Sequence, residues 1–206
     1  RLRKGIQFLM KKNQIEAIQG RGKLLDANTL EVGAPTSKKL TARKFILATG
    51  SEPLKLPIFP FDGKTVLTSD DALALTQAPK SVLIVGGGYI GVEWASIFRQ
   101  VGAKVTVVEM MDQLLPRSDT DLAKELYRLF RKAGVDIHLG TKVDSVQAKD
   151  GKAVSALSNG KQVESDFVLV SIGRGLNTKD IGLEAAGVKT ERGAVVIDEQ
   201  CRTSVP

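Results

Sequence analysis

Three glycines at fixed spacing are the residues of this chain with the clearest chemical purpose. Gly86, Gly88 and Gly91 follow an apolar run and open a stretch of helical spacing in VLIVGGGYIGVEWASIF. Gly86 permits a sharp strand-to-helix turn, and Gly88 has no Cβ to keep a diphosphate away from the backbone. The free N–H groups at a helix start favour phosphate. This context predicts a dinucleotide site formed by Gly86, Gly87, Gly88, Tyr89, Ile90 and Gly91.

One acidic residue completes this pattern. Glu109 ends the next strand-like run, KVTVVE, about 20 residues after the glycines, where the dinucleotide fingerprint requires an acid. Its carboxylate can accept hydrogen bonds from both ribose hydroxyls of NAD. It would repel the 2′-phosphate of NADP by roughly 4 kcal/mol per charge pair at a surface-like dielectric. Because Met110 and Met111 supply no compensating arginine, we expect NAD to be preferred over NADP.

The elements that must position these residues follow a βαβαβ pattern from residue 80. The sequence predicts strands at 82–85, 104–109 and 135–139, and helices that end at Gly102 and Gly134. The second helix is expected to begin at a capping box formed by Ser118 and Asp121. The pairs Asp150-Gly151 and Asn159-Gly160 favour tight hairpin turns. They predict a three-stranded meander, in place of a crossover helix, before a last core strand at 166–172.

The section before residue 80 has a different pattern. A basic amphipathic segment comes first, and strands are expected at 14–20 and 44–50 around a polar hairpin at 22–32. Prolines at 53, 57 and 60 indicate a linker-like stretch.

Composition narrows the class of protein. The 206 residues carry a formal net charge of +7, but the basic residues are scattered and aromatics are only 5%. We therefore expect solvated basic faces and no nucleic-acid partner. No apolar run reaches 18 residues, so we expect no membrane partner. The single cysteine, Cys201, excludes an internal disulfide and favours a reducing compartment. The single histidine, His138, is expected to be structural, and no metal site is predicted.

Three segments together resemble a known family. GGGYIGVEWA, with ILATGSEP upstream and SIGRGLNT…LEAAGV downstream, is similar to the flavin-dependent pyridine nucleotide–disulfide oxidoreductases. Within them the resemblance is closest to the members that oxidise dihydrolipoyl groups. It implies an α/β, Rossmann-like three-layer FAD/NAD(P)-binding fold with a β-meander. Residues 1–79 would be the second half of an FAD-binding domain, 80–198 an inserted NAD-binding domain, and 199–206 the start of the return to the FAD domain.

The resemblance also assigns roles to individual residues. Tyr89 and Glu93 would lie near the nicotinamide and assist catalysis, although a packing tyrosine and a solvent-facing glutamate explain them equally well. Val143 and Gly173 would contact NAD, and Leu176 stands before Asn177 where the family commonly has proline. Contacts to FAD would come from a hairpin glycine and a strand-end turn: Gly22, Thr49, Gly50 and Ser51.

The resemblance implies a function for a longer protein, the parent, of which this chain would be a part. The chain lacks an initiating Met, and we expect it to be an internal piece of a longer chain. In the family, electrons pass from a dithiol, here a lipoyl group, through a disulfide and FAD to NAD. With one cysteine and one histidine the fragment alone is expected to be inactive. Alternatives are a soluble transhydrogenase, a mercuric reductase or an NAD-binding module without turnover. The parent is expected to be a homodimer of the cytoplasm or an organelle matrix.

Overall fold

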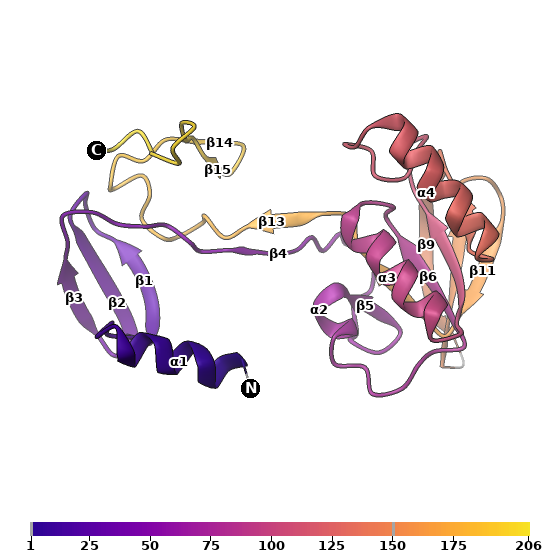
Figure 1. Ribbon diagram of the computed structural model, residues 1–206, viewed down its shortest axis with the longest axis horizontal. Coiled ribbons are helices and arrows are strands. Elements are labelled where there is room, and N and C mark those ends of the chain that lie inside the picture. The colour runs from indigo at the N-terminus through magenta and orange to yellow at the C-terminus, as the bar shows by residue number, and fades with distance from the viewer. Residues whose placement is uncertain (1, 150) are drawn as a thin grey trace. The chain divides into compact units, whose positions relative to one another are not determined.

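The computed structural model describes residues 2–149 and 151–206, which divide into two compact units (Figure 1). One unit holds the chain up to residue 51 together with 176–206, and the other holds 52–175. Compactness thus places boundaries at 51/52 and 175/176. The division expected from the family, at 79/80 and 198/199, concerns cofactor binding and stays a prediction.

A parallel five-stranded sheet forms the centre of the unit 52–175. Its order is β5-β12-β6-β7-β8, with β5 at Val66–Thr68, β12 at Phe167–Val170, β6 at Ser81–Val85, β7 at Lys104–Val108 and β8 at Asp136–His138. In register, Val82 lies opposite Val105, and Val107 lies opposite Ile137. Parallel strands buried on both faces read as apolar runs, which is why VLIV and VTVV were recognisable in the sequence. The predicted βαβαβ order is confirmed.

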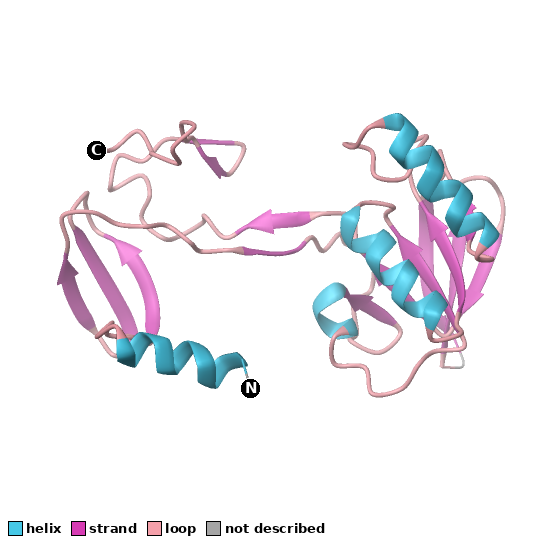
Figure 2. Ribbon diagram, viewed as in Figure 1, coloured by secondary structure: helices cyan, strands magenta, loops and turns pink. Residues whose placement is uncertain are grey.

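Two helices cover one face of this sheet (Figure 2). α3 spans Tyr89–Gln100 and α4 spans Thr120–Lys132. Phe98 of α3 is buried against Phe167, and Trp94 stacks on Phe98 with ring centroids 5.0 Å apart. Phe130 of α4 packs on the same apolar cluster. No helix in the described residues has the length and apolar character to span a bilayer.

The predicted meander covers the other face. β9 (Val143–Lys149), β10 (Lys152–Leu157) and β11 (Gln162–Ser165) pair antiparallel. Their inner side chains join an apolar cluster with β6 and β12, which includes Leu83, Val146 and Val168. The expected turn at Asn159-Gly160 is present, whereas Asp150 of the first turn lies outside the described residues. Helices, parallel sheet and meander give the three-layer α/β fold, which is confirmed.

Some local predictions about this unit are wrong. The fifth strand, β5, and the short helix α2 (Ser69–Ala72) were not expected, since elements of three and four residues carry too little pattern. The last core strand is shorter than the predicted 166–172. The capping box is also wrong, because Asp119 caps α4 through the N–H groups of Asp121 and Leu122.

The other unit has a smaller core. α1 (Leu2–Lys12) is followed by the antiparallel strands β1 (Gly20–Leu24), β2 (Thr29–Pro35) and β3 (Lys38–Thr41), and β1–β2 is the predicted hairpin. Residues from both ends of the chain share a cluster of Leu24, Leu183, Ala186 and Val188. A two-stranded sheet pairs β14 (Thr190–Glu191) with β15 (Ala194–Val195). The strands β4 (Ser51–Pro53) and β13 (Arg174–Leu176), which also pair, include the boundaries 51/52 and 175/176.

The strands predicted at 14–20 and 44–50 do not form. Only Gly20 of the first segment belongs to a strand, and the second segment is irregular. The alternation of 44–50 is nevertheless real, since Phe45 and Leu47 pack on the cluster while Ile46 is 94% exposed. A strand requires a hydrogen-bonded neighbour, and within the described residues neither 14–19 nor 44–50 pairs in a sheet.

Candidate dinucleotide site

The glycine loop joins the end of β6 to the start of α3. Gly86 has φ +103°, and a Cβ there would lie 2.5 Å from the carbonyl oxygen of Ser171. A Cβ on Gly91 would overlap the carbonyl oxygen of Gly86. The hydroxyl of Ser171 donates to the Val85 and Gly86 carbonyl oxygens, 3.1 Å from each. Gly86 is therefore required by the turn, as the sequence predicts, and Gly91 is required by the close approach of α3 to the Gly86 carbonyl.

Gly88 differs from both of these glycines. It is the N-cap of α3 with an extended backbone, and a Cβ there would meet nothing within 4 Å. At the start of α3, the Val92 N–H donates to the Gly88 carbonyl at 3.0 Å. Glycine has no side chain to cap the helix, so the positive helix end at Gly88 carries no side-chain cap and has free space beside the Gly88 Cα. The loop fits a phosphate ligand.

Glu109 lies behind the loop and holds it. The carboxylate is buried, with 8% of the residue exposed, and it accepts hydrogen bonds from two backbone N–H groups. Gly87 donates at 2.6 Å and Met111 at 2.8 Å. A carboxylate has about four acceptor sites, so two of them remain for hydroxyl donors. The position at the strand end matches the sequence expectation, whereas the bond to Gly87 was not foreseen. The ribose contact stays a prediction.

Tyr89 has a partner that sequence reasoning missed. Its hydroxyl lies 3.0 Å from the hydroxyl of Ser118, in the loop that leads to α4. That loop also contacts the glycines, because the Leu115 N–H donates to the Gly87 carbonyl at 2.8 Å. Tyr89 is 61% exposed, so it is not a packing residue. No spacing signal links positions 29 residues apart.

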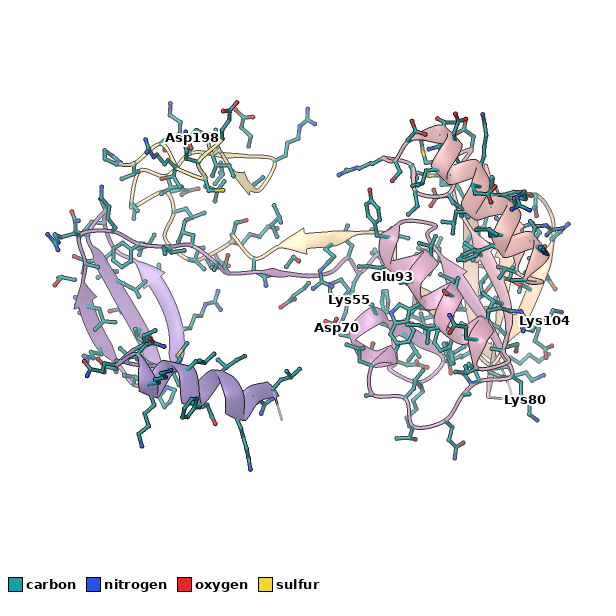
Figure 3. All side chains as sticks on the ribbon, viewed as in Figure 1. Lys55, Asp70, Lys80, Glu93, Lys104 and Asp198 are labelled. Carbon is teal, nitrogen blue, oxygen red and sulfur yellow. The ribbon has the colours of Figure 1, made fainter. Side chains whose placement is uncertain are left out.

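Glu93 and Ile90 follow on the same helix. Glu93 is exposed on α3, as Figure 3 shows, and lies one turn beyond Tyr89 on the same side of the helix. Ile90, in the first turn, is half-buried. The structure thus brings Tyr89 and Glu93 together on one exposed helix face, and their assisting role stays a prediction.

The two other residues assigned to NAD lie at strand ends. Val143 begins β9 and is buried in the apolar cluster beneath the meander. Gly173 has φ +130°, and its carbonyl accepts a hydrogen bond from the Leu54 N–H at 3.0 Å. Burial accounts for Val143 and the positive φ accounts for Gly173 without any ligand. Contact of either residue with NAD stays a prediction.

The residues assigned to FAD lie in the other unit or at its edge. Gly22 is a β1 residue opposite Val32. Gly50 has φ +74° with open space where a Cβ would lie. Asn177 holds this turn, since its N–H donates to the Gly50 carbonyl at 3.1 Å and its side-chain amide to the Thr49 carbonyl at 3.2 Å. The bare backbone at Gly50 is compatible with a close ligand. Ser51 begins β4, and contacts of these residues to FAD remain untested.

The two residues with redox or acid–base potential lie elsewhere. Cys201 is an exposed free thiol. The His138 side chain is largely buried, and its Nε2 lies 3.0 Å from a carboxylate oxygen of Asp136. Among residues 2–149 and 151–206, no group of three or more His, Cys, Asp or Glu side chains could hold a metal ion.

A family profile matches this sequence over its whole length. The family is described as pyridine nucleotide-disulphide oxidoreductase, and the match covers residues 1–206. Among curated proteins, the chain is 41% identical to a dihydrolipoamide dehydrogenase from Chaetomium thermophilum, covering 100% of this chain and 42% of that protein. It is 38% identical to a dihydrolipoyl dehydrogenase from Bacillus subtilis, covering 98% of this chain and 46% of the relative. The chain therefore spans less than half the length of these relatives.

Solved structures agree with this match. The HOCl-induced flavoprotein disulfide reductase RclA from Escherichia coli superposes with a TM-score of 0.82 at 32% identity, over 97% of this chain and 48% of that one. LpdA from Mycobacterium tuberculosis gives a TM-score of 0.87 at 28% identity, over 98% of this chain and 46% of the other. The resemblance expected from the three sequence segments is confirmed.

Proposed function

The chain belongs to the pyridine nucleotide-disulphide oxidoreductase family, and on that premise we propose that it is the NAD-binding segment of a flavin-dependent dithiol oxidoreductase. The parent activity that we propose is that of a dihydrolipoyl dehydrogenase. In it a dithiol such as a dihydrolipoyl group would be oxidised to a disulfide. Curated relatives named dihydrolipoyl dehydrogenase, at 37–38% identity, and one named dihydrolipoamide dehydrogenase, at 41%, support the choice.

The open backbone at Gly88 is the observation that carries this proposal. It leaves the start of α3 accessible to a diphosphate, while Gly86 and Gly91 are closed by their own neighbours. The acid beside this opening, Glu109, already accepts a hydrogen bond from the loop and has acceptor sites left. The residues present fit NAD, with the diphosphate at Gly88 and the adenosine ribose at Glu109.

The remaining roles belong to side chains on one face of α3. We assign to Tyr89 the cover over the nicotinamide end of the site, and to Glu93 a charge beside it. When bound, FAD and NAD supply the two-electron chemistry, in which a dithiol becomes a disulfide and NAD⁺ becomes NADH with release of one proton. The chain's own part is to bind and orient NAD. One cysteine and one histidine do not make up a redox pair with its base, so turnover is proposed only for the parent.

Titration of the purified chain with NADH tests the binding step. We expect saturable heat in calorimetry with wild-type protein and no detectable heat with Gly88→Val. The extended backbone of Gly88 and the free space around it accommodate valine without loss of folding, so unchanged circular dichroism and melting temperature serve as the control. Equal affinity of the two proteins for NADH would contradict the proposal.

The assay of the parent separates the candidate activities. We expect NAD-dependent oxidation of dihydrolipoamide by a yellow protein. Transfer between NADPH and NAD would identify a soluble transhydrogenase instead, reduction of Hg²⁺ a mercuric reductase, and NADH binding without turnover a binding module. We further propose a homodimeric parent in the cytoplasm or an organelle matrix. The exposed free thiol of Cys201 suits a reducing compartment.

A further inference from the structure

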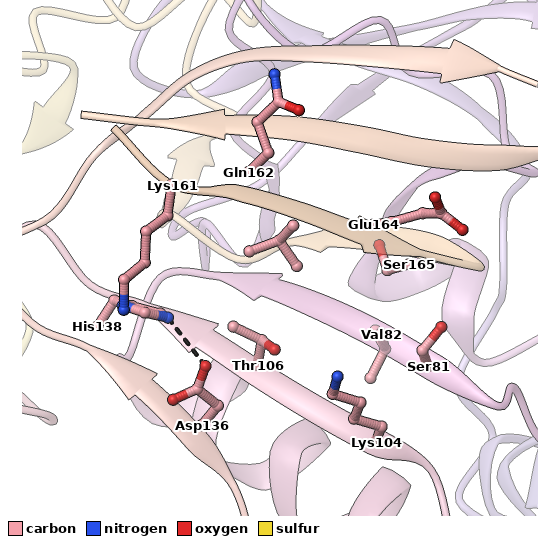
Figure 4. Close-up of a pocket in the computed structure, with 11 residues that line it drawn as sticks. Ser81, Val82, Lys104, Thr106, Asp136, His138, Lys161, Gln162, Glu164 and Ser165 are labelled. Atoms are coloured by element: carbon pink, nitrogen blue, oxygen red, sulfur yellow. Dashed lines mark hydrogen bonds and ion pairs between the residues drawn. The ribbon is translucent and has the colours of Figure 1, made fainter. Parts of the chain in front are cut away.

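A cavity lies between the parallel sheet and the meander, on the face opposite α3 and α4. Its volume is about 290 Å³, and it is lined by β6, β7 and β8 on one side and by β11 with the preceding residue on the other (Figure 4). This volume is at the lower end of the range for ligand cavities, about 300–1,000 Å³. Any ligand that it holds is therefore small.

The lining of this cavity is polar where strand alternation would bury apolar residues. Lys104 and Thr106 are two residues apart on β7 and therefore share the face toward the meander. Asp136 and His138 share the same face on β8. Nearer the centre of the sheet the same face is apolar, as at Leu83. The parallel sheet and the meander thus make an apolar contact near the centre of the parallel sheet and enclose a polar cavity at its β7–β8 end.

The acidic groups of the cavity already have cationic or imidazole partners. One Asp136 oxygen lies 3.2 Å from Arg131, and the other lies 3.0 Å from His138. Glu164 forms an ion pair with Lys152. These pairs leave little unbalanced negative charge beside the cavity.

The two lysines of the lining are unbalanced. Lys104 and Lys161 have no ion-pair partner among the residues that the structure describes. Figure 4 shows Lys161 extending from the meander toward the sheet that carries Lys104. Ser165, also in the lining, is 2% exposed, and its hydroxyl has no hydrogen-bond partner in the described part of the chain. A buried hydroxyl without a partner is costly, so a ligand or water is expected to satisfy it.

We propose that this cavity binds a small oxyanion, a phosphate or a small phosphate- or carboxylate-bearing metabolite. Lys104 and Lys161 provide the charge, and the hydroxyls of Thr106 and Ser165 provide donors within the same lining. None of the residues that line the cavity belongs to the glycine loop. The site is thus additional to the proposed NAD site and does not depend on it.

The single histidine of the chain gives a direct probe. His138 is the only residue that contributes an imidazole signal, and it lines the cavity. Inorganic phosphate titrated into the chain at constant pH and ionic strength is expected to shift the ¹H–¹⁵N imidazole signals along a saturable curve. Chloride at matched ionic strength is expected to leave them in place. Saturating NADH, added first, separates this response from phosphate bound at the glycine loop.

Two variants, each of which removes the charge of one lysine, test the proposal. Lys104→Gln and Lys161→Gln are each expected to weaken phosphate binding by about tenfold, the effect of one charge-assisted hydrogen bond. Both lysines are exposed, so folding is retained. Lys12→Gln, which removes the same charge from α1 in the other unit, is the matched control and is expected to bind as wild type. Ser165→Ala is expected to weaken binding without unfolding the protein.

The proposal fails on either of two results. A shift that rises linearly with phosphate, or equally with chloride, shows a cavity filled by water alone. Wild-type affinity in both lysine variants shows that phosphate reaches His138 from elsewhere. The imidazole signal is read in protein that already holds NADH, so a failure here leaves the NAD proposal standing. If NADH does not bind, the phosphate titration without it still tests this site, because the Lys104 and Lys161 variants change the cavity and leave the glycine loop as it is.

Discussion

Glu109 has two tasks at the scale of single residues. Its carboxylate fixes the glycine loop through Gly87 and fixes its own strand end through Met111. We propose that the same charge contacts the ribose of the dinucleotide. The loop is therefore preformed by the group that we expect to select the cofactor, and little ordering cost is left for binding.

Glu109→Gln separates charge from shape. The amide oxygen still accepts one backbone hydrogen bond, while the negative charge that would repel a 2′-phosphate is gone. We expect the preference for NADH over NADPH, measured as a ratio of dissociation constants, to fall by about tenfold or more, equivalent to about 1.4 kcal/mol. Glu125→Gln, which changes an exposed helix charge on α4, is the control. An unchanged ratio in Glu109→Gln would remove Glu109 from cofactor selection.

At the scale of elements, the start of α4 depends on a contact that the sequence pattern did not predict. The sequence predicts Ser118 as the cap of α4, but the structure caps the helix with Asp119, whose carboxylate accepts from the Asp121 N–H at 2.9 Å. The Ser118 hydroxyl instead lies 3.0 Å from that of Tyr89. We expect Asp119→Ala to lower the free energy of unfolding by about 0.5–2 kcal/mol. Ser118→Ala is expected to change it by far less. Urea denaturation of the two variants measures the free energy of unfolding. A larger loss in Ser118→Ala than in Asp119→Ala would show that Ser118 is the cap.

The short helix α2 gives a pH-dependent prediction. The Thr68 hydroxyl, 2.6 Å from the Asp71 carboxylate, is the main reason that the pKa of Asp71 lies below its ordinary value of 3.8, and the Thr68 N–H adds to it. A carboxyl with a lowered pKa in the folded state stabilises the protein fully above its unfolded pKa. That stability is lost as the pH falls through the lower folded value.

Asp71→Asn tests this dependence. We expect wild type to be more stable than Asp71→Asn near neutral pH, and the difference to shrink as the pH falls below about 4. Guanidinium denaturation across the acidic range measures it. Asp144→Asn, at an exposed position on β9, controls for the loss of one negative charge. A wild-type advantage that persists at the acidic end would contradict the assigned cause.

How much of each element the sequence predicts depends on whether its partners are local. The glycine turn, α3 and the β9–β10–β11 meander follow from short-range signals, namely glycine spacing, helical periodicity and turn pairs. The segments 14–20 and 44–50 were also predicted as strands, yet no strand of the described chain pairs with 14–19 or 44–50. For the site, the positions of Gly88 and Glu109 were predictable. The Tyr89–Ser118 and Glu109–Gly87 contacts were not, because they join segments through the tertiary fold.

The whole molecule divides into units with very different cores. In the unit 52–175, the strands β6, β7 and β12 are buried on both faces, by the helices and by the meander. In the described residues of the other unit, the buried apolar residues are Val32 and a small cluster around Leu24 and Leu183, while α1 has no buried residue. Apolar burial is the main source of stability, so the two units are expected to differ in stability.

Hydrogen exchange followed by mass spectrometry resolves this difference. Amides in β6, β7 and β12 open only with the whole unit, since both faces of those strands are covered, and we expect them to exchange last. Amides of 14–19 and 44–50 donate to no strand neighbour in the described residues and are expected to exchange first. Saturating NADH should slow the residues around Gly88 while leaving 14–19 unchanged, because ligand binding protects the state that binds. Equal protection in both units, lost together in denaturant, would show one cooperative core and contradict the division.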